Sequence, residues 1–224
     1  MIPVCVLVVA KAPVPGLAKT RLATVLGDVA AADIAACALL DTLDAVAHTR
    51  AAARVVALTG DLDDACRADE IRSRLTDFTV ISQRGPGFAE RLANAHLDAA
   101  AVSAGLPVVQ IGMDTPQVTP AQLTGCAQVL SGHDAVLGPA RDGGWWVLGV
   151  RDATSAGCLR QVPMSSPDTG ALTLEALRRN GLRVGLAEEM VDVDTVDDID
   201  TVRRVCARTS RFRRVTASVQ LGER

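Results

Sequence analysis

The chain has 224 residues, of which 49% are apolar and 22% are charged, and its formal net charge is −3. This composition excludes a disordered chain, because the apolar residues suffice for a core. So small a charge does not direct the whole molecule toward nucleic acid. Aromatic residues make up only 2%, so a base-stacking surface is not expected either. The length favours one large domain.

The six cysteines form no C-x-x-C pair, so we predict reduced thiols rather than a zinc site or a disulfide framework. The apolar start lacks a preceding basic segment and leads directly into Lys11 and a loop rich in proline and glycine. It is therefore interpreted as a buried strand and not as a signal peptide. No stretch approaches the roughly 18 apolar residues of a membrane span. We expect a cytoplasmic protein without a membrane span, and the sequence does not indicate its oligomeric state.

Strands and helices alternate along the chain in the predicted order. The predicted strands cover 4–10, 54–58, 78–82, 107–111, 134–137, 145–150 and 183–186. The predicted helices cover 28–48, 63–75, a stretch from the Gly-Pro-Gly turn to 104, 120–130, 172–180 and 198–208. This alternation predicts an α/β fold with a mostly parallel sheet and helices on both faces. The strand 145–150 follows its predecessor too closely for a helical crossover, so we expect it to be antiparallel.

The predicted domain covers residues 1–208. The last segment, 209–224, is basic and breaks the pattern of apolar residues. We interpret it as a frayed C-terminal tail.

The loop after the first predicted strand carries three cations within eleven residues: Lys11, Lys19 and Arg21. Prolines stiffen this loop, and Gly16 allows the backbone to approach a ligand closely. Ligands of open α/β sheets bind beyond the carboxyl ends of the strands. The loop therefore predicts a site for a di- or triphosphate, with a solvated surface loop as the alternative. It is neither a Walker A loop nor a G-x-G-x-x-G loop.

Two acidic segments could hold a metal ion. Asp114 directly follows the fourth predicted strand, where a carboxylate suits Mg²⁺ or Mn²⁺ or, equally well, caps the helix that begins near Pro120. Asp192 and Asp194 lie on the same side of an extended segment. They are candidate partners of Asp114, whereas the two aspartates after them are explained by the start of a helix.

The segment 138–146 contains both tryptophans of the chain, next to an Asp-Gly-Gly sequence. A tight turn would explain the two glycines. The composition also fits a site for a second, cyclic substrate against Trp145 or Trp146. Strand alternation predicts that one of the two tryptophans belongs to the core.

No histidine is placed for catalysis, because His48, His96 and His133 lie in or beside predicted helices. No nucleophile elbow is present either. The expected chemistry is metal-assisted transfer at a phosphate ester, achieved by positioning and charge neutralisation.

Four motifs together resemble a bacterial family described as glycosyltransferase-like, of GT-A nucleotide-diphospho-sugar transferase type. They are Lys-x-Pro-x-Pro-Gly-x-x-Lys-Thr-Arg-Leu, Gly-x-Asp-x-Pro, Asp-Gly-Gly-aromatic and Asp-Val-Asp-Thr, in this order. The similarity extends from about residue 4 to 208. It implies a single three-layer α/β/α Rossmann-like domain.

The resemblance also implies roles for individual residues. A glutamine after the third strand and an arginine on the next helix match the family, whereas residues 86–89 read Pro-Gly-Phe-Ala where the family tends to Gly-Asp-Leu-Gly. The implied nucleotide-binding residues are Lys11, Gly16, Lys19, Arg21, Gln83 and Arg91; the acceptor-binding residues are Asp142, Gly143, Gly144 and Trp145; the metal ligands are Asp114, Asp194 and Asp192; and the catalytic candidates are Lys19, Asp114 and Asp142.

Three functions are compatible with these motifs. The leading one is a metal-dependent enzyme that transfers a glycosyl group from a nucleotide-sugar to a small-molecule acceptor, with Mg²⁺ or Mn²⁺ as cofactor. Residues 18–22 and the Asp-Val-Asp-Thr segment also resemble 2-phospho-L-lactate guanylyltransferases and molybdenum-cofactor nucleotidyltransferases, which implies nucleotidyl transfer from an NTP with release of pyrophosphate. The third function is a nucleotide-binding module without turnover. Fold alone does not decide among them.

Overall fold

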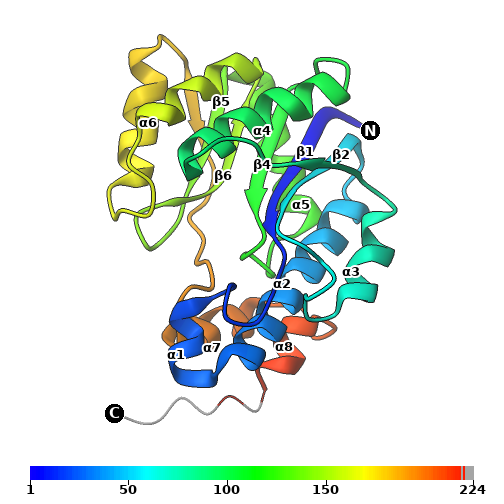
Figure 1. Cartoon of the computed structure of the whole chain (residues 1–224). Coiled ribbons are helices and arrows are strands. Elements are labelled where there is room, and N and C mark those ends of the chain that lie inside the picture. Colours follow the sequence, from blue (N-terminus) through cyan, green and yellow to red (C-terminus); the bar gives the residue numbers. More distant parts are fainter. Residues whose placement is uncertain (218, 220–224) are drawn as a thin grey trace.

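The computed structural model describes residues 1–217 and 219 and shows one α/β domain built on a seven-stranded sheet (Figure 1). The strand order is β3-β2-β1-β4-β6-β5-β7, and β6 runs antiparallel to both β4 and β5, as its short connection predicts. The strands are β1 (Ile2–Lys11), β2 (Ala51–Thr59), β3 (Thr79–Ser82), β4 (Val108–Gly112), β5 (Ala135–Pro139), β6 (Trp145–Val150) and β7 (Val184–Leu186).

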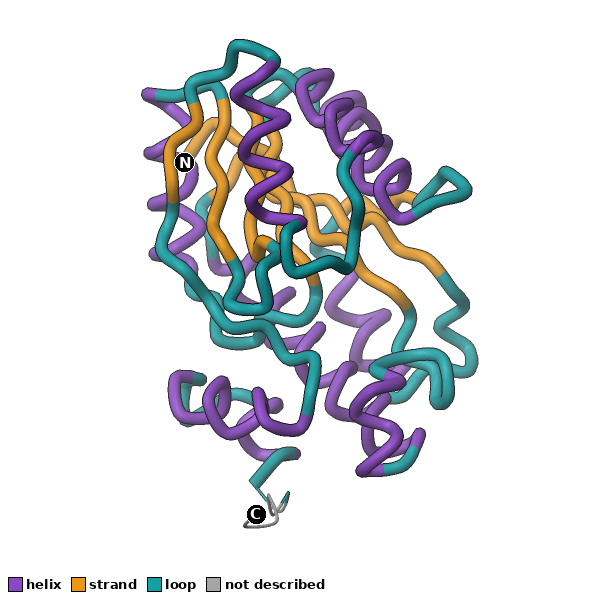
Figure 2. Tube along the Cα trace, turned by 90° about the vertical axis from the view of Figure 1, so that its left-hand side faces the viewer, coloured by secondary structure: helices purple, strands orange, loops and turns teal. Residues whose placement is uncertain are grey.

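Helices cover both faces of the sheet, so the predicted three-layer α/β/α arrangement is confirmed (Figure 2). They are α1 (Thr20–Leu26), α2 (Asp28–His48), α3 (Ala68–Leu75), α4 (Phe88–Val102), α5 (Pro120–Gly132), the 3₁₀ helix η1 (Ala153–Gln161), α6 (Thr169–Arg179), α7 (Val196–Val205) and α8 (Arg211–Val215).

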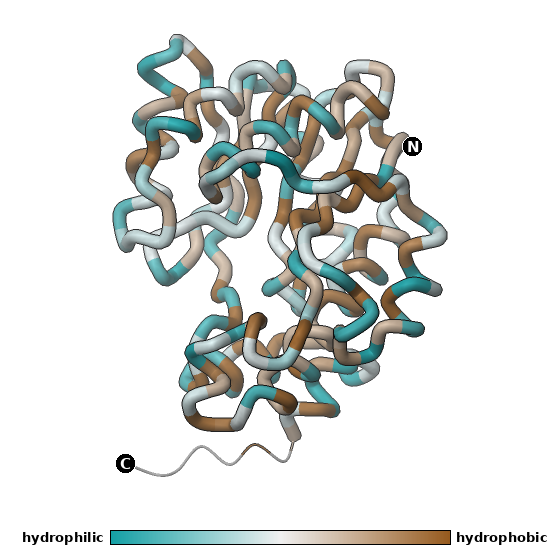
Figure 3. The backbone as a smooth tube through the Cα atoms, viewed as in Figure 1, coloured by the Kyte–Doolittle hydropathy of each residue, from teal (hydrophilic) through white to brown (hydrophobic). Residues whose placement is uncertain are grey.

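The central strand β1 shows why this sequence folds into three layers. Its residues are buried almost without interruption, and successive side chains point to opposite faces. Val6 and Val8 join the core formed with α2 and α5, whereas Cys5 and Leu7 join the core formed with α4 and η1. Figure 3 shows both hydrophobic (brown) and hydrophilic (teal) residues within the helices that cover the sheet.

A third, smaller core lies away from the sheet, where α1 and α8 pack on α2 and α7 packs on α8. It contains Leu22 of α1, Val193 before α7, Ile199 of α7 and Phe212 of α8, and the Phe212 side chain is fully buried. The prediction of a frayed tail from residue 209 is therefore wrong for residues 209–217. A basic segment with one large apolar residue can anchor itself by burying that residue. Residues 218 and 220–224 lie outside the described part of the chain.

Three local elements differ from the sequence-based expectation. The helix predicted over 63–75 begins only at Ala68, because residues 61–67 form turns. The helix α1 and the 3₁₀ helix η1 were not predicted, since each is short and lacks a clear apolar period. Within residues 1–217 and 219, no helix has both the length and the apolar character needed to cross a bilayer.

Candidate active site

A cavity of about 640 Å³ opens at the carboxyl ends of β1, β2 and β4, the edge where ligands of such sheets bind. Polar and charged side chains from several separate stretches of the chain line it together with apolar ones. The predicted site residues on its wall are Lys11, Arg21, Gln83, Arg91, Asp114, Asp142, Gly144, Trp145, Asp192 and Asp194.

Lys19 joins the two acidic segments. Its Nζ lies 2.9 Å from Asp114 Oδ2 and 3.9 Å from Asp194 Oδ1, and it donates a hydrogen bond to the carbonyl of Val193. The Lys19 backbone is left-handed, with φ 49°, a conformation that costs a residue other than glycine roughly 1 kcal/mol or more. Its contacts hold the ammonium group between two carboxylates in a smaller adjoining pocket.

The other cations of the loop stand at the border of the two pockets. Lys11 Nζ donates to the carbonyl of Leu17 at 2.8 Å, and the Arg21 guanidinium pairs with Asp194. Lys11 and Lys19 are the only lysines of the sequence, and both lie here. Gly16 has φ +76° and makes the turn of the loop, but it lines neither pocket.

Asp114 is not the cap of the following helix. Thr119 caps α5 through a hydrogen bond from the backbone N–H of Gln122. One oxygen of Asp114 forms an ion pair with the Lys19 ammonium group, and the other, Oδ1, is buried without a hydrogen-bond partner among the described residues. A buried carboxylate oxygen left in this state can accept a metal ion or a ligand donor.

Asp192 and Asp194 reach the cavity from the segment between β7 and α7. A parallel bridge between Ala140 and Met190 aligns this segment with residues 140–142. Burial and the nearby charge of Asp142 raise the pKa of Asp192 to about 6. Asp198, as expected, belongs to the helix start, where its carboxylate accepts from the N–H of Thr195.

The acidic residues fit a divalent cation only in part. Among the described residues, no three His, Cys, Asp or Glu side chains gather closely enough to form a ready-made metal site. Oxygen donors from one or two carboxylates, completed by phosphate and water, are nevertheless the arrangement that Mg²⁺ prefers. The unpaired oxygen of Asp114 supplies one such donor.

Gln83 and Arg91 approach the cavity from the β3–α4 side. Gln83 Nε2 donates to the carbonyls of Ala10 at 2.8 Å and Ala57 at 2.9 Å, so the amide braces β1 against β2. Arg91 Nε is buried without a hydrogen-bond partner in the described structure. Its guanidinium carbon lies 5.8 Å from the centre of the Phe88 ring.

The Asp-Gly-Gly turn is packed against the start of α6. A side chain on Gly143 would come within 1.8 Å of the Pro167 carbonyl, and the Gly143 carbonyl accepts from the N–H of Gly170. Gly143 therefore serves this packing and does not line the cavity, whereas Asp142, Gly144 and Trp145 do. As strand alternation predicts, the other tryptophan is core: Trp146 is 3% exposed, and its indole N–H donates to the Glu188 carbonyl.

Several residues that line the cavity are not predicted by the sequence motifs. Phe88, Thr115, residues 164–167 and Thr169 line the cavity, as does Gln110, which is 1% exposed. A signal for Gln110 was present, since it is a lone amide within the otherwise apolar strand β4. The segment 164–169 carried no comparable signal.

The fold and its polar cavity define the class: this is the nucleotide-diphospho-sugar transferase fold. The chain is similar to a putative nucleotide-diphospho-sugar transferase from Desulfovibrio desulfuricans G20, with a TM-score of 0.80 and 29% identity over 96% of this chain and 91% of that one. The chain belongs to the family described as "Uncharacterized protein conserved in bacteria (DUF2064)", whose sequence model matches residues 42–166. No curated protein matches the sequence.

More distant structures share the fold. Rv0371c from Mycobacterium tuberculosis H37Rv, solved with manganese, has a TM-score of 0.53 and 20% identity over 88% of this chain and 97% of that one. CMP:2-keto-3-deoxy-manno-octonic acid synthetase, solved with CTP, has a TM-score of 0.54 and 12% identity over 90% and 98%. A putative nucleotide-diphospho-sugar transferase and a CTP-bound synthetase are thus among the structures that share this fold.

Proposed function

We propose that the chain is a metal-dependent enzyme that transfers a glycosyl group from a nucleotide-sugar to a small-molecule acceptor. The observation that carries this proposal is the convergence of Lys19, Asp114 and Asp194 at the edge of the cavity. A cation held between two carboxylates, next to further cations, suits a diphosphate that arrives with a divalent ion. The likeness to a putative nucleotide-diphospho-sugar transferase supports this choice of donor.

Each predicted group has a role in this proposal. Lys11, Lys19 and Arg21 neutralise the diphosphate, with Gly16 shaping their loop. Gln83 and Arg91 border the nucleoside, and Asp142 acts on the acceptor, which lies against Gly144 and Trp145. Because the leaving group is a charged nucleoside diphosphate, neutralising its charge is the main catalytic contribution expected of these residues.

Asp114 and Asp194, with Asp192, would hold Mg²⁺ or Mn²⁺. When bound, such an ion neutralises phosphate charge and orients the phosphate oxygens. For this to happen, Lys19 has to release at least one of its carboxylate partners, since the ammonium group now occupies the side of Asp114 that faces Asp194. We place the protein in the cytoplasm.

Nucleotidyl transfer from an NTP is the second candidate. The fold shared with the CTP-bound synthetase favours it. Both reactions use the same cation loop and metal carboxylates, and they differ in the product: a nucleoside diphosphate from glycosyl transfer, pyrophosphate from nucleotidyl transfer.

A thermal-shift series tests these alternatives. The four NTPs and common nucleotide-sugars are each added with and without Mg²⁺ or Mn²⁺. A ligand at 100 times its Kd stabilises the protein by about 2.7 kcal/mol, which raises the Tm of a domain of this size by roughly 5–11 °C. A metal-dependent shift with a nucleotide-sugar but not with its parent NTP supports glycosyl transfer. The reverse result supports nucleotidyl transfer, and pyrophosphate release is then assayed.

The variant Asp114→Ala should lose the metal-dependent part of the shift while keeping the Tm of the free protein nearly unchanged. Asp168→Ala is the matched control, since Asp168 is exposed and does not line the cavity. If no nucleotide or nucleotide-sugar shifts the wild-type Tm, the proposed function is wrong. If nucleotides bind but neither a nucleoside diphosphate nor pyrophosphate is formed, the protein is a nucleotide-binding module without turnover.

A further inference from the structure

The last two helices carry a concentrated positive charge. Six arginines lie between residues 203 and 214, a stretch without aspartate or glutamate, although the formal net charge of the whole chain is −3. They belong to α7, to α8 and to the connection between them, in the lobe that α1, α7 and α8 form at the lower end of the molecule in Figure 1. Such a run on a chain of opposite net charge indicates contact with an anionic partner, unless the fold pairs the arginines internally.

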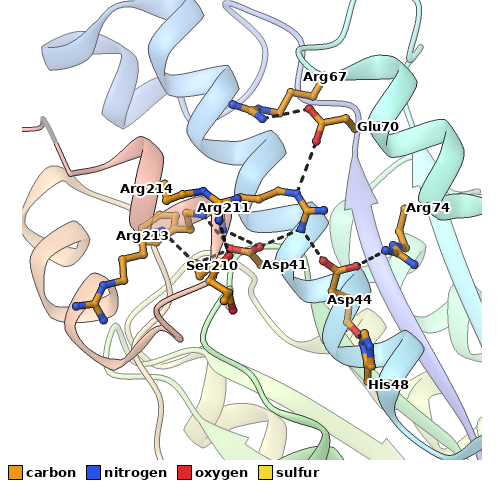
Figure 4. A network of polar contacts seen from close by, with 12 residues as sticks. Asp41, Asp44, His48, Arg67, Glu70, Arg74, Ser210, Arg211, Arg213 and Arg214 are labelled. Atoms are coloured by element: carbon orange, nitrogen blue, oxygen red, sulfur yellow. Dashed lines mark hydrogen bonds and ion pairs between the residues drawn. The ribbon is translucent and has the colours of Figure 1, made fainter.

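One of the six arginines, Arg211, is paired internally. Its guanidinium forms ion pairs with Asp41, Asp44 and Glu70. Figure 4 shows this guanidinium among the carboxylates, whereas the Arg213 side chain of the same helix points away from them. Attachment of α8 to α2 therefore explains Arg211, and it leaves the other five arginines to be explained.

Contacts between α7 and α8 bring arginines of both helices together. Arg203 Nη1 donates to the carbonyl of Thr216 at 2.7 Å, and Arg213 Nη1 donates to the carbonyl of Cys206 at 3.0 Å. Each helix thus holds an arginine against the end of the other. An open hollow of about 380 Å³ lies there, and it is lined by Asp200, Arg203, Arg204, Arg213 and Ala217.

The connection between the two helices continues this surface. Arg214 Nη1 donates to the carbonyl of Thr209 at 2.9 Å, and Thr209 directly follows Arg208. Arg208 and Arg214 are exposed, and the Arg204 side chain is 78% exposed. We call this surface the basic face; its residues are Arg203, Arg204, Arg208, Arg213 and Arg214.

Positive charge exceeds negative charge on the basic face. The carboxylate in its hollow is Asp200, which forms ion pairs with Arg203 and Arg204. The other three arginines of the face form no ion pair within the described part of the chain. The acidic residues in the first turn of α7 lie at the opposite end of that helix, next to the cavity. An anionic partner can therefore neutralise the face without meeting a compensating cluster of carboxylates.

Exposed aliphatic side chains accompany these charges. Val205 directly follows Arg204 at the end of α7 and is 67% exposed. Leu17, Val25 and Val29, in or beside α1, are 59–68% exposed. Arginines next to exposed aliphatic groups suit the headgroup layer of an anionic membrane. Single-stranded nucleic acid also offers phosphates, but its bases are bound by stacking on aromatic side chains, and the one aromatic residue of this lobe, Phe212, is fully buried.

We propose that the basic face docks the protein on the surface of a membrane rich in anionic phospholipids. The arginines bind headgroup phosphates, and Val205 enters the boundary between headgroups and acyl chains. This inference goes beyond the proposed function and does not depend on it. The helix α7, about 15 Å long, separates the basic face from the carboxylates of the cavity, so docking leaves the cavity close to the lipid surface.

Co-sedimentation of the full chain with vesicles tests the proposal. One set of vesicles contains phosphatidylcholine alone, and the other contains phosphatidylcholine and phosphatidylglycerol in equal amounts. We expect binding to the anionic vesicles at about 0.1 M salt and none to the neutral ones. Binding should be lost at about 1 M salt, because the Debye length then falls from about 10 Å to about 3 Å.

A pair of double variants with equal loss of charge sharpens the test. An arginine near an anionic surface strengthens binding by about fivefold, so Arg204→Gln with Arg208→Gln should weaken it by about thirtyfold. Arg178→Gln with Arg179→Gln removes two exposed arginines at the end of α6 and should keep wild-type binding. All four side chains are exposed, so both double variants should keep the wild-type Tm.

Val205→Ser separates the apolar contribution from the charge. It should weaken binding to anionic vesicles by about threefold or more and leave the dependence on salt unchanged. It also supplies the test if the double variant of the basic face does not fold.

Four results would overturn the inference. The first is the absence of binding to anionic vesicles at about 0.1 M salt, and the second is equal binding to neutral and anionic vesicles. The third is an equal loss of binding in the two double variants. The fourth is tighter binding to a single-stranded RNA oligonucleotide than to the anionic vesicles, which would assign the basic face to nucleic acid. A nucleotide-dependent rise in Tm reports on the proposed function separately.

Discussion

Polar side chains gather in two partly buried regions of this protein. The regions differ in whether these groups have hydrogen-bond or ion-pair partners within the protein. Where α2 meets the start of α8, the Asp41 carboxylate accepts hydrogen bonds from Ser210 Oγ at 2.6 Å and from the N–H groups of Arg211 and Phe212 at 3.0 and 2.9 Å (Figure 4). The Arg211 guanidinium continues to Asp44 and Glu70. In the cavity, by contrast, Arg91, Gln110, Asp114 and Trp145 each keep an atom without a partner.

The difference distinguishes polar groups that hold the fold together from polar groups that are available to a ligand. Asp41 satisfies the first N–H groups of α8, which no helix can satisfy internally. It thereby fastens the C-terminal helix to α2. The cavity groups are costly to leave unpaired, so a ligand is the natural partner of those that line it. Disrupting the first region should reduce stability, and disrupting the second should reduce binding.

The largest loss of stability is expected from Phe212→Ala. The ring is fully buried in the third core, and removing it should lower the free energy of unfolding by about 4 kcal/mol. Urea denaturation followed by circular dichroism measures this. Phe212→Leu, which refills most of the volume, should recover more than half of the loss. Equal losses in both variants would mean that the ring is not packed as described.

Asp41→Ala should lower the free energy of unfolding by about 3 kcal/mol, because two backbone N–H groups and the Arg211 guanidinium lose a buried acceptor together. The same denaturation experiment applies. Asp69→Ala, which removes a fully exposed carboxylate of α3, is the control and should leave the unfolding curve in place. A wild-type curve for Asp41→Ala would show that α8 is held by Phe212 alone.

Lys19→Ala tests ligand binding at the cavity. It should weaken binding of a nucleoside triphosphate with Mg²⁺ by roughly tenfold or more, the value of a hydrogen bond to a charged group, and leave nucleoside binding nearly unchanged. Calorimetric titration measures both affinities. Arg208→Ala removes an equal charge from an exposed site away from the cavity and should change neither. Equal losses for triphosphate and nucleoside would contradict a phosphate-binding role.

The sequence predicted the parallel sheet, the antiparallel β6 and the loops that meet at the cavity, because apolar runs and strand ends are local properties. It also predicted that one tryptophan would be core. It could not predict α8, whose anchor depends on Asp41, about 170 residues earlier in the chain. Nor could it show that Lys19 would pair with Asp114, or that Gly143 would pack against Pro167. Such contacts depend on where distant segments meet, which no local pattern encodes.

His96 offers the last test, because it is an unpaired buried group that does not line the cavity. It is fully buried in α4, neither ring nitrogen has a partner among the described residues, and burial lowers its pKa to about 3. Above the unfolded value of about 6.5, both states are neutral. Between about 6.5 and 3, only the unfolded chain takes up the proton. In this range the free energy of unfolding should fall by about 1.4 kcal/mol for each unit by which the pH is lowered.

His96→Leu should therefore flatten the dependence of stability on pH between 6 and 4 and leave stability at pH 7 equal or higher. Urea denaturation at pH 7, 5.5 and 4.5 measures this slope. Leu92→Met, on the same helix, changes packing without removing a titrating group and should keep the wild-type slope. An unchanged slope in His96→Leu would mean that the imidazole finds a partner after all. A flattened slope assigns the loss of stability at low pH to the buried imidazole of His96, which lies outside the cavity.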